Sequence, residues 1–173
     1  GALGKNGKLA SDFLMALQTN GATRKDTLLP LTIDLPLVVV GGGLTAVDTA
    51  TEALAYYPLQ VEKVQHCYRI LKKEMPPQDF ANFINGKFSD AEGTQLKNWL
   101  DHAECLENER ICAKKDQRPP NYLPLLNKWG GVHLIYRKAL QESPSYRLNH
   151  PELQSALNEG VLLWENTQIK DIN

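Results

Sequence analysis

The chain is poor in cysteine and carries almost no net charge. Its 173 residues include three cysteines, Cys67, Cys105 and Cys112, without a C-x-x-C pair, and the net charge is −1. The odd cysteine count favours a reducing compartment, the cytoplasm, and indicates no redox-active dithiol in this chain. No apolar run approaches the roughly 20 residues that cross a bilayer. We therefore expect neither a membrane nor a nucleic acid as a partner.

The two ends of the sequence also lack the usual signals. There is no initiator methionine, and the residues up to Phe13 contain no apolar stretch before a cleavage site, so we expect no secretion signal. The sequence ends abruptly at Asn173, soon after an apparent strand. We interpret residues 1–173 as one domain cut from a longer protein, with the composition of a globular chain.

Apolar runs predict three strands. The run Leu37-Val38-Val39-Val40 is apolar, continuous and mostly β-branched, which is typical of a strand buried on both faces of a parallel sheet. Further runs at 132–136 and 161–164 predict the second and third strands.

Helical patterns lie between these strands. Leu44, Val47, Thr51 and Leu54 recur at three- and four-residue steps, and Pro58 is expected to end that helix. Helical spacing continues through an insert at about 58–128, and another helix is bounded by Pro151 and Gly160. The order predicts an α/β fold, a Rossmann-like three-layer parallel sheet with right-handed crossovers and a helical insertion.

A glycine-rich motif follows the first strand and opens the first helix. The motif is Gly41-Gly42-Gly43-Leu44-Thr45-Ala46, which fits G-x-G-x-x-A. In such a motif the first glycine allows a tight turn, the second lets a pyrophosphate approach the backbone, and the alanine keeps the helix close to the strand. The helix N-terminus then offers N–H groups to the phosphates. A glycine turn can also be plain chain geometry, which is the alternative at this point.

Two basic residues end the second strand. Arg137 and Lys138 follow Tyr136, where NAD and FAD sites usually place an acidic residue for the ribose hydroxyls. A carboxylate repels a 2′-phosphate, whereas a guanidinium binds it through paired, charge-assisted hydrogen bonds. The sequence therefore favours NADP(H) over NAD, and disfavours FAD at this site. The alternative is that both side chains simply end a strand in solvent.

Three blocks of the sequence resemble one known family. The blocks are VVVGGGLTAVDTA from Val38, YRKALQESP from Tyr136 and HPELQSALNEGVLLW from His150. They are similar to the nucleotide-binding segment of the glutamate synthase small subunit and related flavoproteins of the pyridine nucleotide–disulfide oxidoreductase superfamily. The resemblance implies nucleotide contacts by the glycine motif and a 2′-phosphate contact by Arg137, with Lys138 as a like-charge replacement.

The resemblance implies an FAD-dependent parent enzyme. This chain would bind NADP(H) and deliver hydride to a flavin held by the remainder of the parent flavoprotein, its expected partner, and would have no turnover alone. No catalytic residue and no metal site is predicted in the chain. Two alternatives stay open: an FAD-binding fragment, or a non-catalytic binding module with a decayed nucleotide site and a partner on the insert.

Overall fold

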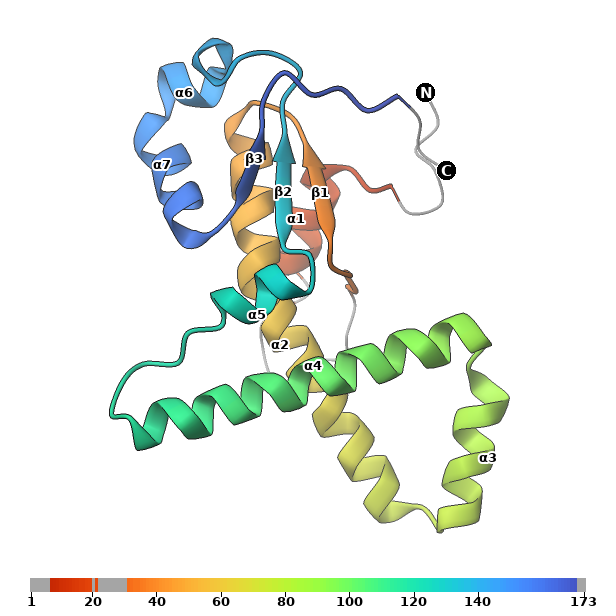
Figure 1. The fold of residues 1–173 in the computed structure, drawn as a ribbon. Coiled ribbons are helices and arrows are strands. Elements are labelled where there is room, and N and C mark those ends of the chain that lie inside the picture. Colours follow the sequence, from red (N-terminus) through yellow and green to blue (C-terminus); the bar gives the residue numbers. More distant parts are fainter. Residues whose placement is uncertain (1–6, 20, 22–30, 171–173) are drawn as a thin grey trace. The chain divides into compact units, whose positions relative to one another are not determined.

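The computed structural model describes residues 7–19, 21 and 31–170 (Figure 1). Seven α-helices, one 3-10 helix and three strands are assigned within this described part. Their order is α1 (Ala10–Thr19), β1 (Leu37–Val40), α2 (Leu44–Glu74), α3 (Pro77–Lys87), α4 (Asp90–Lys115), α5 (Leu123–Lys128), β2 (Val132–Ile135), η1 (Leu140–Glu142), α6 (Pro144–Leu148), α7 (His150–Glu159) and β3 (Leu162–Trp164).

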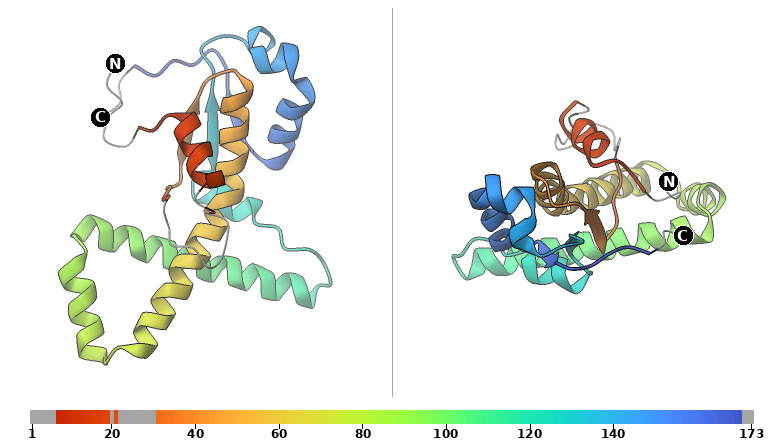
Figure 2. Two further views of the ribbon diagram at one scale, coloured as in Figure 1. Left: turned by 180° about the vertical axis from the view of Figure 1, so that it is seen from behind. Right: turned by 90° about the horizontal axis from the view of Figure 1, so that it is seen from above.

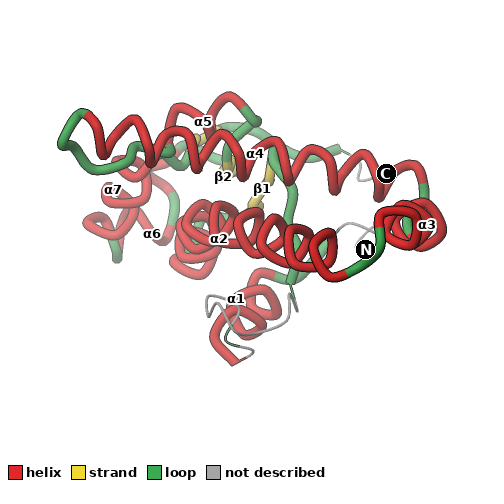
Figure 3. The backbone as a smooth tube through the Cα atoms, turned by 90° about the horizontal axis from the view of Figure 1, so that it is seen from below, coloured by secondary structure: helices red, strands yellow, loops and turns green. Residues whose placement is uncertain are grey.

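The expected Rossmann-like three-layer α/β fold is wrong. Helices make up most of the described residues, and the strands are short pieces within a largely helical chain (Figure 3). The strands do form one parallel sheet, in the order β1-β2-β3. The prediction failed because apolar runs locate strands but do not determine how many helices cover the sheet they form.

The sheet is buried on one face only. Its register pairs Val39 with Leu134, and both side chains are buried. The next pair, Val40 and Ile135, points to the opposite face of the sheet. The views from the front and from behind place α1 and α2 on the same side of the strands (Figures 1 and 2). The prediction that Val38–Val40 is buried on both faces is therefore wrong, because Val38 and Val40 are exposed.

Small residues allow α2 to pack closely in the core of the sheet unit. Ala46, Val47, Ala50, Ala53 and Leu54 are buried along one stripe of the helix. Helix α7 contributes Leu153 and Ala156 to the buried set, and α1 contributes Phe13 and Leu17. The predicted bounds of α7 are confirmed, since Pro151 lies in its first turn and Gly160 ends it in the left-handed conformation at φ 110°.

Helix α2 does not end at Pro58, as the sequence predicted. It continues to Glu74, with the proline inside it. A proline within a helix removes one backbone hydrogen bond and costs about 3 kcal/mol. Tyr56 and Tyr57 before the proline and Val61 after it are almost fully buried. Burial of these side chains offsets the penalty, since each contributes about 1.5–3 kcal/mol.

The chain divides into two compact units within this long helix. A sheet unit comprises residues 1–57 and 123–173, and a helical unit comprises Pro58–Tyr122. In the helical unit, Ser89 and Glu92 form a capping box at the start of α4. Across the described residues, every helix is too short or too polar to traverse a lipid bilayer.

Candidate functional site

The glycine turn begins where β1 ends, and Gly41 needs to be glycine. Its φ is 150°, in the region that side chains rarely adopt. Its N–H donates to the carbonyl of Ile135 at 3.0 Å, which extends the ladder between β1 and β2. A Cβ at Gly41 would lie 3.1 Å from the Cβ of Ala46, so the strand and helix approach closely here. Any larger residue than alanine at position 46 would separate them.

Gly42 lies directly beneath an aromatic ring. A Cβ at this position would lie 2.4 Å from Cε2 of Tyr136, so no side chain fits without movement of that ring. The carbonyl of Gly42 accepts a hydrogen bond from the N–H of Ser145 at 2.9 Å. The segment after β2 therefore covers this part of the glycine turn.

Gly43 faces open space. A Cβ built on Gly43 would meet no atom within 4 Å, in contrast with Gly42. Its carbonyl accepts from the N–H groups of Ala46 at 3.1 Å and Val47 at 3.3 Å, which closes the first turn of α2. The first N–H groups of a helix have no carbonyl partner within that helix. The space beside Gly43 is thus available to a group that accepts hydrogen bonds.

The remaining motif residues differ in exposure. Thr45 is exposed, Leu44 is half-buried, and Ala46 is buried against the strand. Leu44 and Thr45 occupy the first two positions of α2. The structure thus brings the predicted set from Gly41 to Ala46 into one turn at the carboxyl end of β1.

The two predicted basic residues lie at the end of the neighbouring strand. Arg137 and Lys138 are both exposed and follow Tyr136, whose ring lies on Gly42. Lys138 already has a partner, because its Nζ lies 3.1 Å from Oε2 of Glu142. The ion pair is about half exposed, so it neutralises part of the lysine charge and contributes little stability. Arg137 is therefore the stronger candidate for an anion contact.

A carboxylate lies farther along the same helix. Burial raises the pKa of Asp48, and the nearby charge of Glu152 in the first turn of α7 raises it further. These two negative charges would repel a phosphate on that side of α2.

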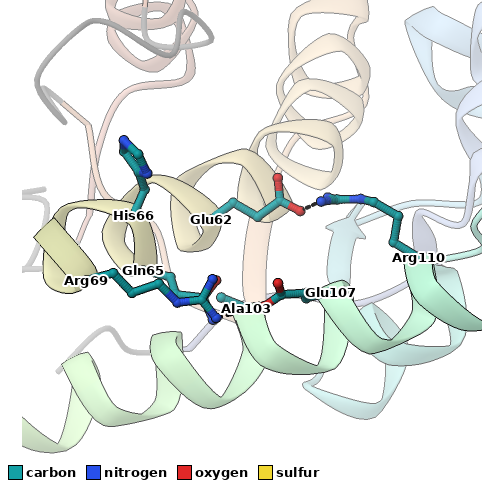
Figure 4. A pocket seen from close by; sticks show the side chains of 7 residues that line it. All are labelled: Glu62, Gln65, His66, Arg69, Ala103, Glu107 and Arg110. Atoms are coloured by element: carbon teal, nitrogen blue, oxygen red, sulfur yellow. Dashed lines mark hydrogen bonds and ion pairs between the residues drawn. The ribbon is translucent and has the colours of Figure 1, made fainter.

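A cavity of about 190 Å³ lies within the helical unit between α2 and α4 (Figure 4). Its two arginines are already engaged, Arg69 with Glu107 at 2.8 Å and Arg110 with Glu62. The hydrogen bond from Arg69 lowers the pKa of Glu107, so this pair stays ionised at neutral pH. Because its charges neutralise one another, this cavity offers no clear selectivity for a ligand of either sign.

Sequence reasoning missed the residues that cover the glycine turn. Tyr136 lies on Gly42, Ser145 binds its carbonyl, and Glu142 pairs with Lys138. The YRKALQESP block contained Tyr136 and Glu142, but nothing in its spacing indicated a contact with a turn almost a hundred residues earlier. The i to i+4 spacing of Lys138 and Glu142 was the one available signal.

One relative is much longer than this chain. The chain is 36% identical over 170 residues to a protein of Rickettsia prowazekii (strain Madrid E) that is named "Uncharacterized protein RP006". The match covers 98% of this chain and 21% of the Rickettsia protein, so the chain spans about a fifth of that relative's length. No family model matches the sequence, and no solved structure matches it.

Proposed function

We propose that the sheet unit binds NADP(H) at the glycine turn between β1 and α2. The observation that carries the proposal is the open space at Gly43, at the start of a 31-residue helix. A helix N-terminus carries a partial positive charge of roughly half an elementary unit and unpaired N–H donors. A pyrophosphate in contact with the backbone of Gly43 would satisfy both features.

Arg137 supports the choice of NADP(H) over NAD(H). It follows β2, next to the turn that Tyr136 covers, and its side chain is exposed. A guanidinium can donate two parallel hydrogen bonds to a phosphate, and the phosphate's negative charge strengthens them, whereas an unphosphorylated ribose carries no such charge. Lys138 would add charge but not this geometry, and part of its charge is neutralised by Glu142.

A single methyl group tests the phosphate site. In Gly43→Ala the added Cβ meets no protein atom, so the fold should be unchanged, whereas a bound pyrophosphate would collide with it. We expect calorimetric titration to show NADPH binding weakened at least about tenfold, which is 1.4 kcal/mol. Gly93→Ala in α4 is the matched control, since a Cβ there also meets nothing. Equal NADPH affinity in Gly43→Ala and the unchanged chain would overturn the proposal.

Removal of the guanidinium tests the nucleotide preference. In Arg137→Ala we expect the difference between NADPH and NADH affinity to fall by about 1.5–3 kcal/mol, because hydrogen bonds to charged groups are of this size. Arg147→Ala is the matched control, since this exposed arginine lies in the same unit on α6. Identical NADPH and NADH affinities in the unchanged chain would exclude the assignment of NADP(H).

The parent enzyme in this proposal is an FAD-dependent oxidoreductase of the pyridine nucleotide–disulfide type. The nicotinamide, when bound, supplies a hydride to a flavin held by another part of the parent, and this chain positions the nucleotide. The isolated chain should therefore bind NADPH without turnover. We propose the cytoplasm as its location, supported by three free, exposed cysteines at positions 67, 105 and 112.

The second candidate function is a docking module without nucleotide. It is favoured by the ring of Tyr136, which already covers Gly42. The same titrations separate the candidates: absence of binding of NADPH, NADH and FAD to the chain would favour the module. A yellow protein with bound FAD would instead favour an FAD-binding fragment.

A further inference from the structure

The sheet presents an uncovered apolar face, which we call the outer face. It consists of the side chains that alternate away from the core on the three strands: Val38, Val40, His133, Ile135, Leu162 and Trp164. Val40 is 61% exposed and Trp164 is 53% exposed, whereas Val39 and Leu134 on the opposite face are buried. In Figure 1 the outer face is turned toward the viewer, and α1 and α2 lie behind the strands.

This concentration of apolar residues is unusual for a free surface. Two adjacent positions of β1 on this face are valines, and they neighbour Ile135 on β2, which in turn neighbours Trp164 on β3. Contiguous exposed apolar groups on a soluble chain mark a contact surface, while single ones do not. The outer face is contiguous across the sheet.

The polar atoms of the outer face are already satisfied within it. Nε1–H of Trp164 donates to Nδ1 of His133 at 2.7 Å, and Nε2 of His133 lies 2.7 Å from the carbonyl of Gly130. Because Nδ1 accepts, Nε2 carries the proton and donates. A buried polar group is costly only when it lacks a hydrogen bond. The outer face can therefore be covered by an apolar surface without leaving these ring nitrogens unpaired.

The relative's length bears on which partner could cover the outer face. Nearly all of this chain matches a protein of which it represents 21%, so most of that polypeptide lies outside the matching region. We propose that the outer face docks in cis against an apolar surface of the remaining part of such a longer polypeptide. This inference does not depend on nucleotide binding at the glycine turn.

Thiol labelling tests the contact in two proteins. Val40→Cys is made in this chain, and the aligned residue is changed to cysteine in the full-length Rickettsia protein. Alkylation by N-ethylmaleimide is followed peptide by peptide. We expect the cysteine to react at least about tenfold more slowly in the full-length protein. Leu148→Cys, on α6 and 80% exposed, is the matched control and should react equally fast in both.

Three outcomes are distinguishable. Slower reaction at position 40 alone supports docking in cis, and equal rates in the two proteins overturn it. If this chain sediments as a dimer in which position 40 is already protected, the occupant is a second copy, which also overturns it. Hydroxyl-radical footprinting of the unmodified proteins, read on the peptide that contains Trp164, gives the same comparison without any substitution. None of these measurements involves a nucleotide.

Discussion

The two compact units begin their long helices in different ways. In the helical unit, α4 starts at Ser89, whose hydroxyl accepts from the N–H of Glu92 while the Glu92 carboxylate accepts from the N–H of Ser89. In the sheet unit, α2 starts after Gly43, which has no side chain, and the backbone carbonyl of Gly43 accepts from the N–H groups of Ala46 and Val47 instead. A capping box closes a helix start with the chain's own groups. The start of α2 has no such side-chain cap, and the proposed phosphate site lies there.

The units also differ in the pairing of their arginines, and the sheet unit has the exposed outer face. Within the helical unit, arginines pair with glutamates, and Arg118 together with the N–H of Asn121 lowers the pKa of Glu109 to about 2. The sheet unit leaves Arg137 exposed and the outer face uncovered. Arginine charges of the helical unit, those of Arg69, Arg110 and Arg118, are thus paired with glutamates of the same unit. The space beside Gly43 and the outer face, on which the two proposals rest, both lie on the sheet unit.

The largest expected effect tests the one-sided burial of the sheet. Leu134→Ala removes a side chain that is 2% exposed in the central strand. We expect the free energy of unfolding to fall by about 3 kcal/mol, from lost burial and the cavity left behind. Val40→Ala on the outer face is the control and should cost less than about 1 kcal/mol. Urea unfolding followed by fluorescence measures both, and equal losses would contradict one-sided burial.

A smaller loss should follow from a methyl group beneath Tyr136. In Gly42→Ala the Cβ meets the ring at 2.4 Å, and we expect a loss of about 2 kcal/mol in the free energy of unfolding, typical of overpacking. Gly43→Ala is the control and should unfold like the unchanged chain. A second substitution, Tyr136→Ala, should remove most of the difference between the two alanine variants. The contact is refuted if Gly42→Ala and Gly43→Ala are equally stable.

Loss of a cap should distinguish the two helix starts. Ser89→Ala removes the hydroxyl that caps α4, and we expect a loss of about 1 kcal/mol. Thr45→Ala, in the first turn of α2, should leave stability nearly unchanged. Thermal unfolding followed by far-ultraviolet circular dichroism measures both variants. Comparable losses at the two positions would mean that the two helices start alike.

The smallest effect concerns Asp48. Its pKa is raised by burial and then by Glu152, so it is higher in the folded than in the unfolded chain. A carboxyl of this kind destabilises the fold when ionised, and stability falls as pH rises through the interval between the two pKa values. Asp48→Asn should therefore raise the melting temperature by about 1 °C at pH 7. The gain should disappear at about pH 3, where the carboxyl of Asp48 is largely protonated in the folded and in the unfolded chain. Glu52→Gln on the same helix serves as the control, and a gain that persisted at low pH would contradict this origin.

Several elements were predictable because their signals are local. The capping box at Ser89, the end of α7 at Gly160 and the strand that precedes Gly41 each depend on residues within one turn. Hydrogen bonds and backbone angles at such sites involve few neighbours, so the pattern identifies them. The glycine turn and the basic residues after β2 were located in the same way, and their nucleotide remains a prediction.

The failures share a different cause. Pro58 carries a strong local signal for a helix end, yet buried side chains on both sides of it keep α2 continuous. Val38–Val40 carries a strong signal for burial on both faces, yet one face of the sheet is open. In both cases packing by segments distant in sequence decided the outcome, and local propensity is too weak to compete with it.

The sequence by itself determined where the chain turns, where its helices are capped, and which residues stand at the carboxyl ends of β1 and β2. Tertiary structure alone decided that Tyr136 covers Gly42, that the space beside Gly43 stays open, and that Val40 and Trp164 share an uncovered face. The physical reason is the separation in sequence between the groups that interact. Turns and caps are formed by hydrogen bonds between near neighbours, whereas burial depends on which distant side chains reach the same place.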